Sequence, residues 1–455
     1  MKKHIFTVLV LLLSLALNAQ VSVWDGSYEP YDTIYAGTED DPILIENAAQ
    51  LAYMATLSYS STSIKYYKLM VDVDLNNHDW CPIGYRDLPS YVAFYGYFDG
   101  CNHTIYHLNA PLFYWIQDGS LQNITIRESN INIPYYPFGS VAVSAPLIEN
   151  CHNYGTLIYA YDNCGIPEGD AYVGGVVGTC GTIRNCSNHG FFVINVTPRI
   201  GLLCIGGVAS EAGEAEMCYN EGTMLFESEI SSCYVGGICG QIDNRVSYCY
   251  NTADLAFDYE NSNVGGIMGR STTLPNETIV INSCYSAGSL AATNVGGIVA
   301  AKQYDNSIVS IGSCYYINTV ESLNDFGIPK SEPEMKTQEF VDLLNNGGNV
   351  FAMDLLNVNN GFPVFSGYTS IVENQSQYNA LVYPNPARDY IRIELQDDSS
   401  CQSIAIYSID GRLVETFPAT SHPTTINISG LNAGMYIMKV RLSDGMEYSQ
   451  RIVKE

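Results

Sequence analysis

The stretch Val173-Gly174-Gly175-Val176-Val177-Gly178 decides the fold of this chain, because near-copies of it follow four more times. The later copies begin 29 to 32 residues apart, at Ile205, Val235, Val264 and Val295. A second phrase, Cys-x-Asn-x-Gly in its fullest form, recurs in step with the first and begins at Cys151, Cys186, Cys218, Cys249, Cys284 and Cys314. A fixed period with two locked motifs predicts a stacked repeat architecture.

The content of each repeat favours a parallel β-helix over other repeat folds. Two or three short apolar runs alternate with Gly, Asn or Asp, which tolerate the positive φ of tight corners. The leucine-rich pattern Leu-x-x-Leu-x-Leu does not occur in the repeats, and a propeller blade needs about 40 residues. We therefore predict an all-β solenoid over residues 94–316, with one coil for each period of about 30 residues.

The first 19 residues have the pattern of a secretory signal peptide. Lys2 and Lys3 precede an apolar run of 13 residues, 5–17, and cleavage is expected between Ala19 and Gln20. The alternative is a membrane anchor, but a spanning helix needs about 20 apolar residues. We expect an exported protein without a transmembrane span.

The charge balance limits the partners of the protein. Asp and Glu number 47 against 20 Lys and Arg, which gives a net charge of −27. Nucleic acids and anionic membrane surfaces repel such a chain. We therefore expect no nucleic-acid partner.

Helical segments are predicted on both sides of the coils. Residues 20–93 form an N-terminal capping module in which Asn47 begins a helix at Ala48–Leu57. Residues 317–377 form a C-terminal cap and linker with a helix at Gln338–Leu344. Solenoids need such caps, because an uncovered last coil exposes unpaired backbone groups and apolar side chains.

The cysteines of the second motif fall at one position in each coil. Neighbours in such a column lie about 4.8 Å apart with parallel side chains, whereas a disulfide needs side chains turned toward each other. We therefore predict a buried ladder of free thiols that packs as small apolar groups. Disulfides among the other cysteines, such as Cys164 with Cys180, stay open in an oxidising compartment. Zinc is disfavoured because the sequence contains no Cys-x-x-Cys pair.

The last segment, residues 378–455, has a different pattern from the coils. The dipeptides Asp410-Gly411 and Asp444-Gly445 lie between strand-like runs and are typical of hairpin turns. The runs cover residues 390–395, 403–407, 413–417, 424–428, 435–442 and 448–453. Six or seven short strands in this length predict a small antiparallel, Ig-like β-sandwich.

Three blocks of this segment resemble a known export signal. They are Val382-Tyr383-Pro384-Asn385-Pro386-Ala387-Arg388-Asp389, Ile406-Tyr407-Ser408-Ile409-Asp410-Gly411-Arg412 and Ile428-Ser429-Gly430-Leu431-Asn432-Ala433-Gly434-Met435-Tyr436. Together they resemble the C-terminal sorting domain of the type IX (Por) secretion system. The motif residues would be Tyr383, Pro384, Asn385, Pro386, Asp410, Gly411, Leu431, Gly434 and Tyr436. An ordinary Ig-like binding module is the alternative.

The resemblance to a sorting domain has consequences for location and partners. It implies export by the type IX machinery of a Bacteroidota-type bacterium, with the passenger either released or held at the outer-membrane surface. Surface lipopolysaccharide would be the attachment partner.

The coils resemble GLUG-motif surface proteins. The matching blocks are the Val-Gly-Gly-x-x-Gly series, Asp72-Val73-Asp74-Leu75, Trp80-Cys81-Pro82-Ile83-Gly84 and Gly96-Tyr97-Phe98-Asp99-Gly100. The resemblance implies a right-handed parallel β-helix with an adhesive or architectural role. Two copies depart from the pattern, because Ser210 and Ala300 replace the last glycine.

The sequence contains no recognisable catalytic motif, so no catalytic, cofactor-binding or metal-binding residue is predicted. His103 and His107 share a strand face but make a poor metal site on their own. We therefore predict a non-enzymatic adhesin or surface scaffold whose ligand is a glycan or a host matrix protein. The alternative is a carbohydrate-active β-helix enzyme, either a polysaccharide lyase or a glycoside hydrolase. Paired carboxylates in a groove, beside a Lys, an Arg or calcium, would favour that alternative.

Overall fold

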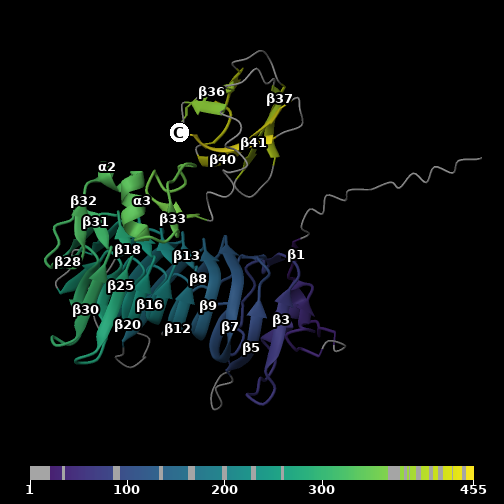
Figure 1. Cartoon of the computed structure of the whole chain (residues 1–455). Helices are drawn as coiled ribbons and strands as arrows, with labels where there is room; N and C mark the ends of the chain where they lie inside the picture. Colours follow the sequence, from purple (N-terminus) through teal and green to yellow (C-terminus); the bar gives the residue numbers. More distant parts are fainter. Residues whose placement is uncertain are drawn as a thin grey trace, which may run out of the picture. The chain divides into compact units, whose positions relative to one another are not determined.

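Short strands from successive repeats pair in parallel and in register through most of the chain (Figure 1). The computed structural model describes residues 21–32, 36–85, 93–132, 137–161, 170–196, 202–226, 232–257, 261–366, 380–383, 387–388, 390–395, 401–408, 413–418, 424–432, 434–442 and 447–454. The chain divides into two units, Met1–Glu332 and Pro333–Glu455. The first unit is a parallel β-solenoid of about seven turns, which confirms the predicted fold.

The Val-Gly-Gly copies form a sheet of their own. Val173 pairs with Ile205, and the copies that follow continue this register through Val264 to Val295. The five strands of this glycine sheet are β11 (Ala171–Gly174), β15 (Leu203–Gly206), β19 (Cys233–Gly236), β23 (Ser262–Gly265) and β28 (Asn294–Gly296). The sequence period therefore equals the structural period.

The second and largest sheet, called here the long sheet, contains the longest strands of each coil. Its main strands are β3 (Lys65–Leu69), β5 (Phe94–Asp99), β7 (Phe113–Arg127), β9 (Ala142–Asn153), β12 (Val177–Arg184), β16 (Ala209–Glu216), β20 (Cys239–Ser247), β24 (Met268–Ser271), β25 (Thr278–Asn282), β29 (Val299–Lys302) and β30 (Ile308–Gly312). After a corner it continues in β4 (Val73–Asp74), β6 (Thr104–Tyr106), β13 (Ser187–Asn188), β17 (Tyr219–Asn220), β21 (Tyr250–Asn251), β26 (Tyr285–Ser286), β31 (Tyr315–Ile317) and β32 (Ile328–Lys330).

A third face completes each coil. It consists of β8 (Asn130–Asn132), β10 (Thr156–Tyr161), β14 (Phe191–Val196) and β18 (Met224–Phe226), followed by the pair β22 (Leu255–Phe257) and β27 (Leu290–Ala292). Inward-facing apolar side chains from all three faces fill the core. Phe192, Val235 and Ile242, one from each face, are fully buried.

The two glycines of the Val-Gly-Gly motif are required by close backbone contacts. A Cβ atom on Gly236 would collide with the carbonyl oxygen of Cys239 at the turn into β20. A Cβ atom on Gly237 would collide with the carbonyl oxygen of Gly266 and with the side chain of Asn251. The second glycine of one motif therefore packs against the asparagine of the other motif, which explains why the two recur in step.

The asparagines of the second motif form a buried ladder. Asn153 Nδ2 donates to Asn188 Oδ1 at 2.8 Å, and the pairs Asn188–Asn220 and Asn220–Asn251 follow at 2.9 Å each. All four side chains are fully buried. Asn188 and Asn220 are thus satisfied by the coils on either side, while Asn153 and Asn251 also bond to the backbone of their own coils, so each buried amide has partners.

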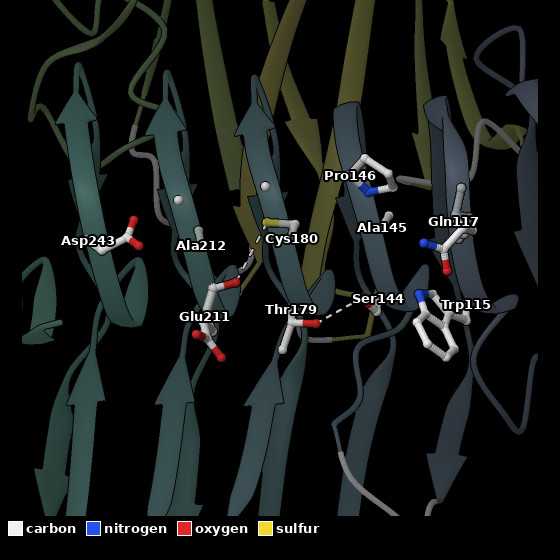
Figure 2. A pocket seen from close by; sticks show the side chains of 13 residues that line it. Trp115, Gln117, Ser144, Ala145, Pro146, Thr179, Cys180, Glu211, Ala212 and Asp243 are labelled. Carbon is white, nitrogen blue, oxygen red and sulfur yellow. Dashed lines mark hydrogen bonds between the residues drawn. The ribbon is translucent and has the colours of Figure 1, made fainter. Parts of the chain in front are cut away.

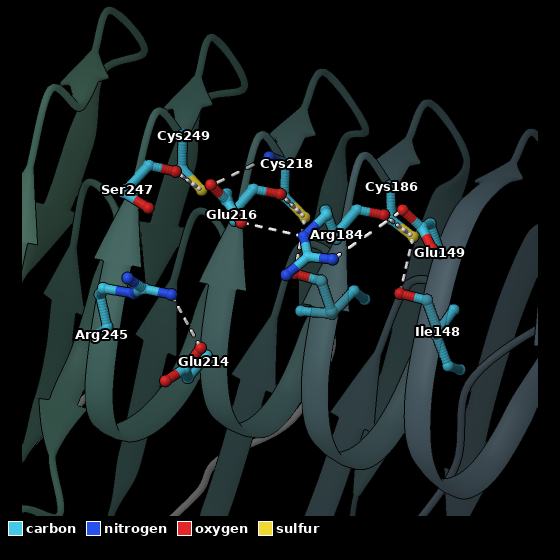
Figure 3. Close-up of polar contacts among 11 residues, drawn as sticks. Ile148, Glu149, Arg184, Cys186, Glu214, Glu216, Cys218, Arg245, Ser247 and Cys249 are labelled. Carbon is cyan, nitrogen blue, oxygen red and sulfur yellow. Dashed lines mark hydrogen bonds and ion pairs between the residues drawn. The ribbon is translucent and has the colours of Figure 1, made fainter. Parts of the chain in front are cut away.

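The motif cysteines form the predicted thiol ladder (Figure 3). All six are buried and free. Each Sγ donates to the carbonyl oxygen two residues earlier, at 3.1 Å for Cys186 and 3.3 Å for Cys218. Burial raises the pKa of the Cys186 and Cys249 thiols well above the ordinary value, so they stay protonated. Cys164 lies outside the described residues. Cys180, for which the sequence leaves a disulfide with Cys164 open, is free, and its thiol donates to the Glu211 carbonyl oxygen.

Parallel pairing begins close to the N-terminal end of the described chain. Strand β2 (Ile43–Ile45) pairs with β3, and β1 (Ser22–Val23) pairs with β4. Helix α1 (Ala48–Met54) follows β2 and buries its apolar side chains. Its cap is the predicted one, since Asn47 Oδ1 accepts from the Gln50 N–H at 2.8 Å, but it ends three residues before the predicted Leu57.

Helix α2 (Glu332–Met335) includes the division between the two units in the sequence. The second unit continues with helix α3 (Gln338–Asn345) and the antiparallel pair β33 (Phe351–Ala352) and β34 (Val364–Phe365). Helix α3 confirms the predicted segment. Within the described ranges, no helix combines the length and apolarity that a membrane span requires.

The rest of the second unit confirms the predicted antiparallel strands. One sheet holds β35 (Ala380–Tyr383), β36 (Tyr390–Leu395) and β39 (Thr424–Asn427), and the other holds β37 (Cys401–Ser408), β38 (Leu413–Pro418), β40 (Gly434–Leu442) and β41 (Glu447–Lys454). Apolar residues of both sheets, such as Ile393 and Ile404, form one buried core.

Candidate functional site

A shallow groove crosses the outer surface of the long sheet, over strands β7, β9, β12, β16 and β20 (Figure 2). Its volume is about 550 Å³. It is lined by Trp115, Ile116, Gln117, Ser144, Ala145, Pro146, Thr179, Cys180, Gly181, Glu211, Ala212, Gly213 and Asp243.

The groove exists because three successive coils place small residues side by side. Cys180 pairs in register with Ala145 on one side and Ala212 on the other. The next residue in each strand is Pro146, Gly181 or Gly213. Because these residues are small, the surface over the three strands is low. On the next strand, β20, the equivalent position is Asp243, whose side chain is longer.

One wall of the groove is a column of polar side chains that ends in an indole. Trp115, Ser144, Thr179 and Glu211 are register partners on β7, β9, β12 and β16. Thr179 Oγ1 donates to Ser144 Oγ at 3.0 Å, and the Trp115 side chain is 37% exposed. An aromatic face beside hydroxyl and carboxylate groups is suited to a ligand that has both apolar faces and polar edges.

A second hollow of about 700 Å³ continues the groove toward β24 and β29. Glu211 and Asp243 line both hollows. The other residues are Tyr172, Gln241, Asn244, Arg270, Thr272, Thr273, Leu274, Glu277, Thr278 and Gln303. We call the two joined hollows the groove from here on.

Arg270, the cation that lines the groove, interacts with two neighbouring side chains. Arg270 donates from Nε and Nη2 to Gln241 Oε1 at 3.0 and 2.7 Å, and its guanidinium lies 4.5 Å from the ring centroid of Tyr234. Burial raises the pKa of Tyr172 to about 12, so its phenol remains a neutral hydrogen-bonding group. The groove therefore presents three carboxylates, on Glu211, Asp243 and Glu277, several neutral polar groups and one arginine.

Glu211 and Asp243, the carboxylates that both hollows share, do not form a facing pair. Glu211 is the register partner of Gln241, and Asp243 lies two residues beyond Gln241 on β20. Figure 2 shows their side chains on neighbouring strands at different levels along the strand direction.

Ion pairs lie on the same sheet, beyond the groove (Figure 3). Arg184 Nε is 2.9 Å from Glu216 Oε2, and Arg245 Nη2 is 3.0 Å from Glu214 Oε2. Exposed pairs of this kind contribute little to stability, about 0 to 1 kcal/mol each. Their effect here is to neutralise cations that could otherwise attract an anionic ligand.

A Ser–His–Glu cluster, which the sequence analysis missed, lies at the corner between β13 and β17. Ser187 Oγ is 3.1 Å from His189 Nε2, and His189 Nδ1 is 3.0 Å from Glu221 Oε2. This order of contacts matches a hydrolase triad. However, Ser187 is fully buried, and its hydroxyl also contacts His152 Nδ1 at 2.8 Å. A nucleophile must reach its substrate, so we interpret the cluster as a structural network.

Two histidines near the N-terminal coils also have carboxylate partners from the preceding coil. His103 Nδ1 lies 2.9 Å from Asp72 Oδ1, and His107 Nδ1 lies 2.7 Å from Asp74 Oδ1. Neither contact was predicted from the sequence. Among the described residues, no group of three or more His, Cys, Asp or Glu side chains is arranged to hold a metal ion.

The predicted sorting-motif residues are described in part. Tyr383 ends β35, Gly434 begins β40, and Leu431 packs against the buried core of the sandwich. Tyr436 donates its hydroxyl to the Asn432 carbonyl oxygen at 2.9 Å. The other motif residues and the predicted cleavage site lie outside the described residues, namely Ala19, Gln20, Pro384, Asn385, Pro386, Asp410 and Gly411.

The family model of the secretion system C-terminal sorting domain matches residues 381–455. The chain therefore ends in a type IX sorting domain, which directs it to the outside of a Bacteroidota-type cell, secreted or at the outer-membrane surface. The type IX machinery is a partner of this domain.

Other comparisons give little functional information. No curated protein matches the chain. Among solved structures, it is similar to a Bacteroides ovatus protein described only provisionally as an immunoglobulin A1 protease, with 20% identity and a TM-score of 0.46 over 73% of this chain and 94% of that one. It is also similar to an IgA1 protease, with 18% identity and a TM-score of 0.41 over 59% of this chain and 21% of that one. Likenesses this distant carry no argument about activity.

Proposed function

We propose that this secreted β-solenoid protein is a non-catalytic adhesive module whose groove binds an extended polymer outside the cell. The observation that carries the proposal is the continuity of the groove. Two hollows that share Glu211 and Asp243 run across successive strands of one sheet. Each coil adds one side chain at a fixed register, so the surface is long, regular and rigid, as suits a repeating ligand.

The arrangement of charged groups supports binding over catalysis. Glycoside hydrolysis needs two carboxyl groups about 5 to 9.5 Å apart on opposite sides of one bond. Glu211 and Asp243 are diagonal neighbours on adjacent strands of one outer surface, so both carboxylates face a bound chain from the same side (Figure 2). Arg270, the cation that could assist, donates to Gln241.

The test is binding by the mature full chain to an array of glycans and extracellular-matrix proteins. Thr179→Trp places an indole across the middle of the groove, and Trp is well tolerated in strands. Thr182→Trp is the matched control, because it adds the same side chain to β12 at a position that does not line the groove. We expect the first variant to lose binding and the second to keep it. Equal binding by both variants would overturn the proposal.

A carbohydrate-active enzyme is the second candidate, since Glu211, Asp243 and Arg270 share one hollow. In that case purified protein would depolymerise a polysaccharide, and either Glu211→Gln or Asp243→Asn would abolish the release of reducing ends or unsaturated products. We expect no such release from the wild-type protein. Turnover that depends on one of these carboxylates would replace the adhesive proposal.

A further inference from the structure

We infer that the groove takes an uncharged, hydroxyl-rich polysaccharide strand that lies across the β-strands, with one sugar ring stacked on Trp115. This inference rests on the proposed function and specifies its ligand. It depends on four properties of the groove, namely its charge, the pairing of its floor, its side chains and its length.

The charge of the groove excludes anionic ligands. Its first hollow is lined by Glu211 and Asp243 and by no Lys, Arg or His. In the second hollow, both described hydrogen bonds of Arg270 go to Gln241 Oε1, and its guanidinium covers Tyr234. A uronate, sialylated or sulfated chain would therefore meet three carboxylates against this one cation, in a protein of net charge −27, and would be repelled.

The pairing of the floor argues against an extended peptide. Peptides in strand conformation bind chiefly by adding to an open sheet edge, where backbone groups are unpaired. The floor strand β12 already pairs with β9 on one side and β16 on the other. Recognition in this groove must therefore come from side chains.

The side chains that line the groove can bind both the polar edges and the apolar faces of sugar rings. Ser144 and Thr179 supply hydroxyl groups, and Glu211 and Asp243 supply carboxylate oxygens that accept from sugar hydroxyls. The partly exposed Trp115 indole supplies a flat apolar surface at one end. Few ligands other than carbohydrates have hydroxyl-rich edges and apolar faces in every unit of the chain.

The spacing of the coils fits a repeating chain. Neighbouring strands lie about 4.8 Å apart, which is close to the length of one pyranose unit in an extended polysaccharide. From β7 to β20 the first hollow, which holds Trp115, crosses five neighbouring strands, or four steps. It therefore spans about 19 Å, the length of roughly four sugar units.

The experiment is calorimetric titration of the mature full chain with size series of neutral oligosaccharides from β-glucan, β-mannan and xylan. Polygalacturonate and heparin fragments serve as anionic probes, and a lysine-rich peptide serves as the cationic probe. We expect one neutral series to bind, with affinity that rises with length and levels off near four to six units. Trp115→Ala should weaken that binding about three- to tenfold, and Trp115→Phe should weaken it less. Circular dichroism confirms that the variants fold.

The outcomes separate this inference from the proposed function. Binding of an anionic probe, or a neutral series indifferent to Trp115→Ala, overturns the inference. If the lysine-rich peptide or a matrix protein alone binds, and Thr179→Trp removes that binding, the inference fails while the adhesive function stands. If Thr179→Trp leaves every array ligand bound, both fail.

Discussion

At position 217, the native methionine disfavours the backbone conformation that its coil requires. The residue before each ladder cysteine has a left-handed backbone, with φ near 50° at Asn150, Asn185 and Met217. Asparagine tolerates this conformation, whereas methionine does so at a cost of about 1 to 2 kcal/mol. We predict that Met217→Asn raises the free energy of unfolding by about 1 kcal/mol, measured by urea titration.

The neighbouring coils indicate where the new amide would bond. Asn185 Nδ2 donates to Asn150 Oδ1 at 3.0 Å, so an amide side chain at position 217 would extend an existing outer row of amides. Met217→Leu is the matched control, because it keeps both the size and the strained backbone, and it should leave stability nearly unchanged. A Met217→Asn variant less stable than the wild-type chain would contradict the prediction.

His152 makes the stability of the solenoid depend on pH. Burial, with smaller contributions from His189 and Arg127, lowers the pKa of His152 to about 4. The unfolded chain binds a proton more readily than the folded one, so this contribution is complete above pH 6.5 and is lost as the pH falls toward 4. The shift corresponds to about 3 kcal/mol.

We predict that the free energy of unfolding falls less steeply between pH 7 and pH 4 in His152→Gln than in the wild-type chain. Urea titrations at several pH values measure both slopes. The glutamine can still bond to Ser187, which His152 Nδ1 contacts at 2.8 Å, so the variant should fold. Parallel pH profiles for the two proteins would show that His152 is not the titrating group.

At the scale of the element, the two motifs specify how neighbouring coils contact one another. Gly237 faces the Gly266 carbonyl oxygen and the Asn251 side chain, so Gly237→Ala should destabilise the chain by about 2 to 3 kcal/mol. Gly240→Ala is the matched control, since Ser210 and Ala300 occupy the same column in other coils. A Cβ atom on Gly240 would lie 2.8 to 2.9 Å from backbone atoms of Ile205 and Ser210, less close than the contact at Gly237, so the cost of this substitution should be smaller.

The measurement is urea unfolding followed by far-UV circular dichroism for both alanine variants. Ser210 shows why the control position accepts a side chain, because its buried hydroxyl donates to the Cys204 carbonyl oxygen at 2.8 Å. Equal losses at positions 237 and 240 would mean that the contact with the asparagine ladder is not the cause.

The sequence predicted elements wherever local spacing fixes the structure. The register of the Val-Gly-Gly copies follows from their period, and the free thiol ladder follows from the parallel direction of stacked side chains. The strands of the sorting domain were also found, because each is bounded by turn residues.

Contacts between irregular coils could not be predicted in this way. The pairs Asp72–His103 and Asp74–His107 join residues 31 and 33 positions apart, where the repeat lacks both motifs. The floor of the groove, by contrast, could have been predicted from the distance of its residues to the Val-Gly-Gly motif. Gly181 and Gly213 each lie seven residues after the first glycine of their motif copy, and Asp243 lies at the same distance in the next copy.

At the scale of the whole molecule, folding of the sorting domain decides where the groove is presented. Ile404 lies in the middle of the apolar core of the sandwich and is fully buried. A carboxylate at this position would carry a large desolvation penalty and should unfold the domain. We predict that Ile404→Asp, like deletion of residues 378–455, retains the passenger in the periplasm.

Cell fractionation and protease accessibility on intact cells measure the outcome. Trp115→Ala is the control, because it alters the groove and leaves the sorting domain untouched, so it should reach the surface in normal amounts. Surface display of the Ile404→Asp chain at the wild-type level would show that recognition does not need the folded sandwich. Surface display of the chain that lacks residues 378–455 would show that the sorting domain, matched at residues 381–455, is dispensable for export.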